Sequence, residues 1–188
     1  MTILNARERE IVAVGAAIGA GCRPCTQYHV RAALKAGLSE EEIRLAVEEA
    51  EVLRIHAATS IADFARGLLG SSEGRAAPLC SPVEPFQALA QVGAATGSNA
   101  GHALDWLLPY ARGLGLSNEA LSEAVEMAGV VKGMAGEFFR KDAERTLRVK
   151  AEVASPAEAG TCVQAPQPSA VAPADTGCLA TLSSGSCC

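Results

Sequence analysis

The chain matches itself without a gap when it is shifted by 78 residues. The stretch VGAAIG at residues 14–19 then falls on VGAATG at residues 92–97. Further identities at the same shift are Gly37 with Gly115, Leu38 with Leu116, Ser39 with Ser117, and Ala46-Val47-Glu48 with Ala124-Val125-Glu126. Self-similarity at one constant shift indicates a tandem duplication, so the two halves should fold in the same way.

The composition favours helices over strands. Only 4% of the 188 residues are aromatic although 49% are hydrophobic. The chain is instead rich in the small residues alanine and glycine. Small residues suit closely packed helices, whereas sheets are usually rich in β-branched and aromatic side chains. We therefore expect an all-α protein, and a chain of this length buries enough surface to fold without a disulfide or a metal ion.

Each half shows the same signals for helix starts and ends. In the first half we expect a helix up to about Gly19, a second over residues 23–36 and a third over residues 39–69. Gly37 fits a left-handed C-terminal cap, and Ser39 followed by Glu42 forms a capping box. The corresponding helices of the second half are expected at residues 85–97, 101–114 and 118–149. Short alanine-rich helices are stable only when packed, so both halves should form one bundle.

The chain divides by composition into four parts. We predict a first helical repeat over residues 1–69, a linker over 70–84, a second repeat over 85–149 and a tail over 150–188. Gly, Ser and Pro dominate the linker, which contains Cys80. From residue 151 onward the tail has no Lys or Arg and several prolines, a composition typical of disordered segments. It contains Cys162, Cys178, Cys187 and Cys188.

Charge and hydropathy exclude two classes of partner. The net charge is -5 and the pI is about 5.3, so the basic surface that nucleic acids require is not expected. The first residues do not resemble a signal peptide, and no run of about 18 apolar residues predicts a membrane span. We therefore expect a cytoplasmic protein. In that reducing compartment, seven cysteines point to catalysis, metal binding or redox sensing.

The first half differs from the second at one informative motif, Cys22-Arg23-Pro24-Cys25-Thr26-Gln27-Tyr28-His29. At the equivalent positions of the two cysteines and the histidine, the second half has Ala100, Ala103 and Leu107. The scaffold therefore does not need these three side chains in order to fold, which favours a chemical role for them. A structural zinc site is the weaker interpretation, because such sites usually need a second pair of ligands at a separate spacing.

The motif has the spacing of a reactive dithiol at the start of a helix. Positions i, i+3 and i+7 place Cys22, Cys25 and His29 on one helix face. Free N–H groups and the helix dipole favour thiolate there, and cysteines in C-x-x-C settings have pKa values of roughly 3.5 to 7.5. This reasoning favours Cys22, nearer the helix start, as the thiol of lower pKa. Two such thiols can close a disulfide after one is oxidised, and His29 can take a proton from Cys25.

A glutamate followed by eleven residues and C-x-x-C-x-x-x-H resembles the AhpD-like alkylhydroperoxidases, the redox branch of the carboxymuconolactone decarboxylase family. Residues 10–69 carry the resemblance, with Glu10 twelve positions before Cys22. The resemblance implies a tandem helical bundle that assembles as a homo-oligomer, a trimer or a hexamer. It also implies that Cys25 attacks the peroxide, that Cys22 is the more exposed resolving thiol, and that Glu10 and His29 relay a proton to and from Cys25.

These features predict a thiol-dependent hydroperoxide reductase of peroxiredoxin type, cycling through a Cys22–Cys25 disulfide. Its partners would be a hydroperoxide and a thiol or dithiol reductant protein, with no bound cofactor. One alternative is a disulfide oxidoreductase, or a thiol protein that handles soft metals or metalloids. Another is a non-redox decarboxylase of the same family, and the C-x-x-C argues against it. His29 and Glu10 have a plainer interpretation as ordinary polar residues of helix faces.

The tail cysteines give a separate hypothesis. Cys187 and Cys188 are adjacent, and Cys178 lies ten residues before the second of them. These thiols either relay reducing equivalents to the Cys22–Cys25 disulfide or capture a soft metal or metalloid, since soft thiolates suit such ions. The alternative is a tail without a specific role.

Overall fold

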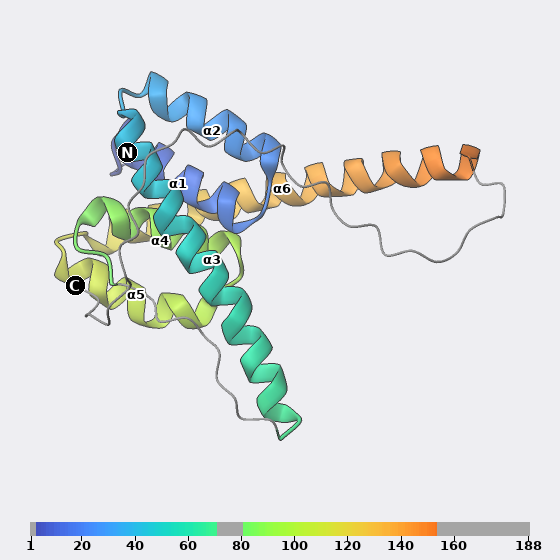
Figure 1. Cartoon of the computed structure of the whole chain (residues 1–188). Coiled ribbons are helices and arrows are strands. Elements are labelled where there is room, and N and C mark those ends of the chain that lie inside the picture. Colours follow the sequence, from blue (N-terminus) through green and yellow to red (C-terminus); the bar gives the residue numbers. More distant parts are fainter. Residues whose placement is uncertain (1–2, 71–80, 154–188) are drawn as a thin grey trace, which may run out of the picture.

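The computed structural model describes residues 3–70 and 81–153, and this part of the chain is built from six α-helices (Figure 1). They are α1 (Ala6–Gly19), α2 (Arg23–Lys35), α3 (Glu40–Leu68), α4 (Pro85–Gly97), α5 (Gly101–Gly113) and α6 (Asn118–Val153). The described residues contain no strand, so the all-α prediction is confirmed. Most of the predicted linker with Cys80, and the tail cysteines, lie outside the described residues.

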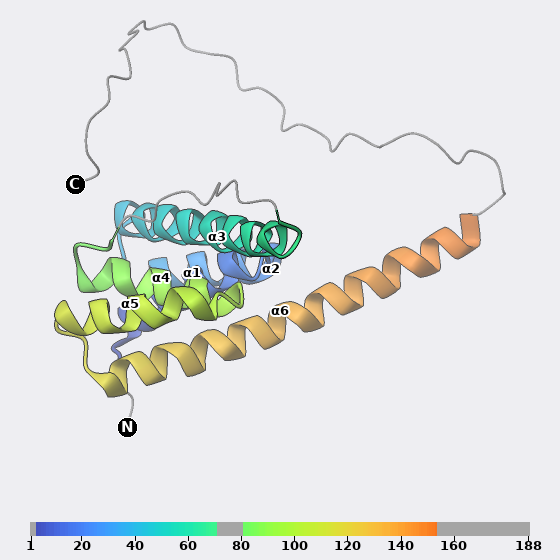
Figure 2. The ribbon, with the colours of Figure 1, turned by 90° about the horizontal axis from the view of Figure 1, so that it is seen from below.

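The duplication predicted from the sequence is present in the fold. α2 and α5 begin and end at residues related by the same shift of 78, and α3 and α6 begin at residues related in the same way. α1 and α4 pack against each other, and each also contacts both α3 and α6. Figure 2 shows the resulting arrangement, in which α3 and α6 lie on opposite sides of the layer formed by the four shorter helices.

Local sequence signals set most of the helix ends. Gly37 follows α2 with φ of +87°, and the N–H of Leu38 donates to the carbonyl of Ala33, as in a left-handed C-terminal cap. Ser39 and Glu42 form the predicted capping box of α3. α6 runs to Val153, four residues past the expected end, because the intervening residues include Lys150, Ala151 and Glu152, which favour helices.

Four glycines allow α1 and α4 to approach backbone to backbone. A Cβ atom at Gly15 or Gly93 would lie 2.2 Å from the carbonyl oxygen of the opposite helix, at Ala90 or Val12 respectively. Gly19 and Gly97, at the helix ends, meet the opposite helix at 2.3 and 2.4 Å in the same reciprocal way. The repeated V-G-A-A-x-G stretch is therefore the central packing interface of the fold.

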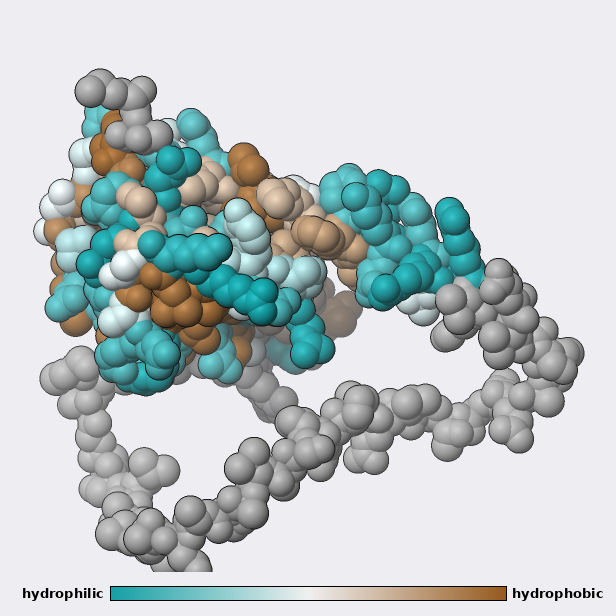
Figure 3. Space-filling view, turned by 90° about the horizontal axis from the view of Figure 1, so that it is seen from above, coloured by the Kyte–Doolittle hydropathy of each residue, from teal (hydrophilic) through white to brown (hydrophobic). Residues whose placement is uncertain are grey.

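The bundle buries its core around this interface, and α6 projects beyond it. Fully buried side chains include Ile11, Val14, Leu53, Leu89 and Leu107. The far part of α6 extends away from the other helices, and its surface is mostly hydrophilic (Figure 3). Among the described helices, none combines the length and the apolar character needed to cross a bilayer.

Replacing Gly93 by alanine should destabilise the protein by at least about 2 kcal/mol, because the new methyl group would overlap the α1 backbone and force the helices apart. The matched control is Gly129→Ala in α6, where no atom lies within 4 Å of the added Cβ. That control should stabilise the protein by roughly 0.5 to 1 kcal/mol. Urea unfolding followed by circular dichroism measures both changes, and equal stability of the two variants would contradict the packing described here.

Candidate active site

Cys22 and Cys25 lie at the turn that joins α1 to α2. The backbone turns at Gly21 with φ of +68°, and Cys22 is the N-cap residue of α2. The two cysteines form a disulfide, with Cα atoms 5.3 Å apart. The backbone N–H of Cys25 donates to Sγ of Cys22 at 3.2 Å. The sulfur of Cys22 therefore occupies the position where a helix N-terminus stabilises negative charge.

The disulfide is not needed to form this turn. In the second repeat, α5 begins after Ala100 with φ of -85° and ψ of 62°, close to the -92° and 98° of Cys22 before α2. Ala100 and Ala103 replace the two cysteines there, and both are buried. A helix therefore starts at the equivalent position of the second repeat without sulfur.

His29 and Glu10 form a pair that joins α2 to α1. Nδ1 of His29 on α2 lies 3.0 Å from Oε2 of Glu10 on α1, and both side chains are partly buried. An ionised carboxylate can only accept, so Nδ1–H donates to it and Nε2 is left as the nitrogen that can take a proton. His29 follows Cys25 by one helical turn, on the same face of α2. The spacing read from the sequence thus brings Glu10 and His29 into direct contact.

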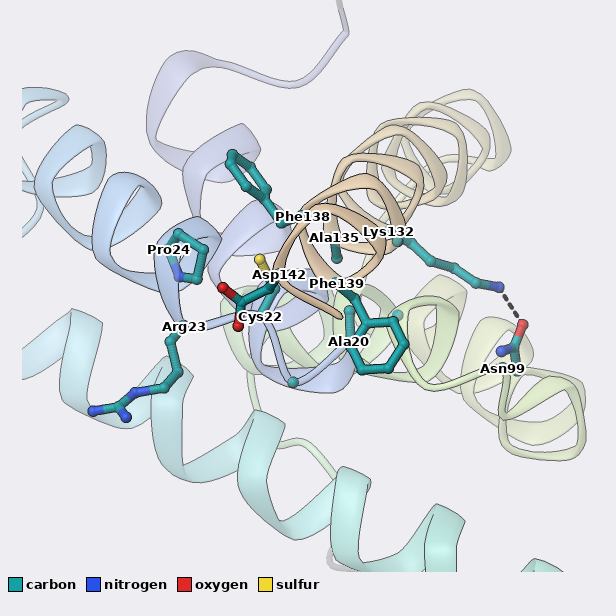
Figure 4. A pocket seen from close by; sticks show the side chains of 13 residues that line it. Ala20, Cys22, Arg23, Pro24, Asn99, Lys132, Ala135, Phe138, Phe139 and Asp142 are labelled. Atoms are coloured by element: carbon teal, nitrogen blue, oxygen red, sulfur yellow. Dashed lines mark hydrogen bonds between the residues drawn. The ribbon is translucent and has the colours of Figure 1, made fainter. Parts of the chain in front are cut away.

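The two cysteines differ in whether they line a hollow of the surface. Cys22 is 7% exposed and Cys25 is 4% exposed, so both are buried, but Cys22 lines two hollows and Cys25 lines neither. The larger hollow, which we call the α6-side hollow, has a volume of about 580 Å³ and lies between the α1–α2 turn and α6 (Figure 4). The smaller one, about 380 Å³, lies toward α3.

Comparison with known families assigns the first repeat. Residues 2–66 match the model of the carboxymuconolactone decarboxylase family. The first repeat is a domain of this family. The matched range contains Glu10, both cysteines and His29, so the resemblance carried by the motif is confirmed. Comparisons with curated proteins and with solved structures find no match.

Two basic residues near the cysteines of this carboxymuconolactone decarboxylase domain were not identified from the sequence. The guanidinium of Arg54 on α3 donates to the carbonyl oxygen of Ile18 at 2.8 Å and lines the smaller hollow. Lys132 on α6 hydrogen-bonds Asn99 and lines the α6-side hollow. Arg54 and Lys132 are equivalent under the shift of 78 residues, so the repeat held a signal for both. Cys22 lines both of these hollows as well.

Unequal access predicts unequal reactivity of the two thiols. In Cys25→Ser, the remaining Cys22 should react faster with a bulky aromatic disulfide reagent than Cys25 does in Cys22→Ser, by about tenfold or more. Both variants should carry Cys80, Cys162, Cys178, Cys187 and Cys188 as serine, so that one thiol is observed. Absorbance of the released thiol gives the rates. Faster modification of Cys25 would contradict the assignment of Cys22 as the accessible sulfur.

Proposed function

We propose that this protein is a thiol-dependent hydroperoxide reductase that cycles through the Cys22–Cys25 disulfide. The observation that carries the proposal is a dithiol at a helix N-terminus with the Glu10–His29 pair one turn away. These are the groups that peroxide reduction needs: a thiolate, a second thiol to resolve it, and a proton carrier.

In the proposed cycle, the thiolate of Cys25 attacks one oxygen of the hydroperoxide. The O–O bond breaks, an alcohol or water leaves after taking a proton, and Cys25 becomes a sulfenic acid. The thiolate of Cys22 then attacks the sulfur of Cys25, the S–O bond breaks, and hydroxide leaves as water once protonated. An external thiol or dithiol protein reduces the resulting disulfide by attacking Cys22, the sulfur that lines both hollows.

Glu10 and His29 have the role of moving protons in this cycle. With Nδ1 held by Glu10, Nε2 is the ring nitrogen left to carry a proton, and His29 follows Cys25 by one turn of α2. It takes the thiol proton before attack and returns it to the leaving oxygen. Glu10 is a positioning residue, because it contacts the ring and fixes which nitrogen is free.

The alternative function is disulfide exchange without peroxide chemistry, either with protein thiols or with a soft metal or metalloid. The place of Cys22 at the edge of both hollows supports this alternative, since exchange requires only one sulfur that a partner can reach. A decarboxylase activity, as in the family name, has no evident use for a vicinal dithiol. Reaction with hydroperoxide separates these possibilities.

Stopped-flow measurement of the reduced protein with an organic hydroperoxide tests the proposal. Cys25→Ser should abolish the reaction, whereas Cys22→Ser should still consume about one equivalent but accumulate the sulfenic acid of Cys25 in place of the disulfide. His29→Gln should slow the reaction by roughly 10² to 10⁴, the usual contribution of a proton-transferring group. Glu10→Gln should reduce the rate less than His29→Gln does and should alter the pH profile of the reaction.

His102→Gln, on exposed surface of α5, is the matched control and should react like the unmodified protein. Unchanged rates in both cysteine variants would reject the peroxidase function.

We also propose that the protein is a homo-oligomer of three or six copies. Large apolar side chains at the end of α3 are exposed within the described part of the chain, Phe64 at 66% and Leu68 at 73%. Light scattering should give a multiple of the 19.2 kDa chain mass, and Phe64→Glu with Leu68→Glu should lower it. A monomeric mass for the unmodified protein would contradict the proposal. The cytoplasmic location stays a prediction from the sequence.

A further inference from the structure

The α6-side hollow joins the site to the part of the chain that follows α6. Its walls are the turn at Cys22 on one side and α6, including Phe138, Phe139 and Asp142, on the other. From Asp142, α6 continues to Val153. At 1.5 Å per residue, the end of the helix is about 17 Å from the hollow. A short length of chain after Val153 is therefore enough to span the distance back to the hollow.

The length of that chain is sufficient to return to the site. An extended chain spans up to about 3.3 Å per residue, so the residues between Val153 and Cys178 reach up to about 80 Å. Cys187 and Cys188 have a still longer reach. The chain is therefore long enough for all three thiols to reach the α6-side hollow.

The chemistry of residues 178–188 fits the hollow. This segment reads CLATLSSGSCC and has no charged side chain. The hollow has apolar walls at Pro24, Ala135, Phe138 and Phe139, with the charged Arg23, Lys132 and Asp142 also in its lining. An uncharged segment enters such a surface without the desolvation cost of a charge. It also carries the thiols that the buried disulfide needs for its reduction.

We propose that residues 178–188 dock in the α6-side hollow and pass two electrons to the Cys22–Cys25 disulfide. A thiolate of Cys187 or Cys188 attacks Sγ of Cys22, and the Cys22–Cys25 bond breaks. Cys25 leaves with the electron pair and takes a proton. The thiolate of Cys178 then attacks the tail sulfur of the mixed disulfide, and Cys22 leaves and is protonated. The tail is oxidised to a disulfide, the Cys22–Cys25 pair is reduced, and an external dithiol renews the tail.

Cys178 is the resolving thiol because the adjacent pair cannot easily close on itself. Consecutive Cα atoms are 3.8 Å apart across a trans peptide, whereas disulfides usually need 4.4 to 6.8 Å. Cys162 would close a longer loop with Cys187 or Cys188 than Cys178 does, at a higher entropic cost.

The inference rests on redox cycling of Cys22–Cys25, as in the proposed function. It does not depend on which oxidant closes that disulfide.

The test follows the disulfide with time in a chain carrying Cys80→Ser and Cys162→Ser. The fully reduced protein receives one equivalent of diamide or, in a parallel arm, of an organic hydroperoxide. Samples are quenched in acid, alkylated and analysed by mass spectrometry. The disulfide should appear at Cys22–Cys25 and then move to Cys178 with Cys187 or Cys188. The rate of this movement should not depend on protein concentration, because the transfer is intramolecular.

Three variants make the result specific. Serine at both Cys187 and Cys188 should leave the disulfide at Cys22–Cys25, with its loss slowed at least about tenfold. Cys178→Ser should accumulate a mixed disulfide between Cys22 and the tail. Phe139→Asp, at a side chain 77% exposed, should slow the movement about tenfold, whereas Leu147→Asp, 69% exposed on the same helix but outside the hollow, should not.

Two results would overturn the relay. The first is a Cys22–Cys25 disulfide that persists in the chain with all three tail thiols. The second is a tail disulfide that forms equally fast when Cys22 and Cys25 are both serine, since the tail would then be oxidised directly. If diamide closes the Cys22–Cys25 disulfide but hydroperoxide does not, the peroxidase function fails and the diamide arm still decides the relay.

Discussion

The close contact between α1 and α4 is the constraint on which the rest of the structure depends. Gly15 and Gly93 let the two backbones touch near the centre of the bundle, and Gly19 and Gly97 repeat the contact at the helix ends. The turn with Cys22 follows directly after Gly19, so its place beside α6 is set by this packing. α1 also carries Glu10, and its position against α2 brings that carboxylate to His29. One backbone contact thus positions both the sulfur pair and the Glu10–His29 pair.

The duplication separates the requirements of folding from those of chemistry. Both repeats form the same turn and the same helix start, one with a disulfide and the other with Ala100 and Ala103. Both also keep a basic residue near that turn, Arg54 in one repeat and Lys132 in the other. The first repeat therefore adds a cysteine pair to a framework that both repeats share. The second repeat contributes Lys132 and the wall of the α6-side hollow to the same site.

Much of this could be predicted from the sequence, because the deciding signals are local. The capping box at Ser39, the glycine cap at Gly37 and the repeat itself gave the helices and their order. The motif spacing also indicated that Glu10 and His29 belong to one site. Tertiary features were not predictable in this way. These features depend on how helices distant in sequence cross each other. They include the hydrogen bond from Arg54 to Ile18 and the two hollows that Cys22 lines.

The central claim is that Cys22–Cys25 is a working redox pair and not a structural crosslink. Equilibration with dithiothreitol buffers, followed by alkylation and mass spectrometry, measures its reduction potential most directly. A pair with one accessible sulfur at a helix N-terminus should have a midpoint above about -300 mV, in the range of thiol oxidoreductases, and circular dichroism should show an unchanged helical fold after reduction. A midpoint below about -300 mV, or loss of the helices on reduction, would identify a structural disulfide and contradict the account.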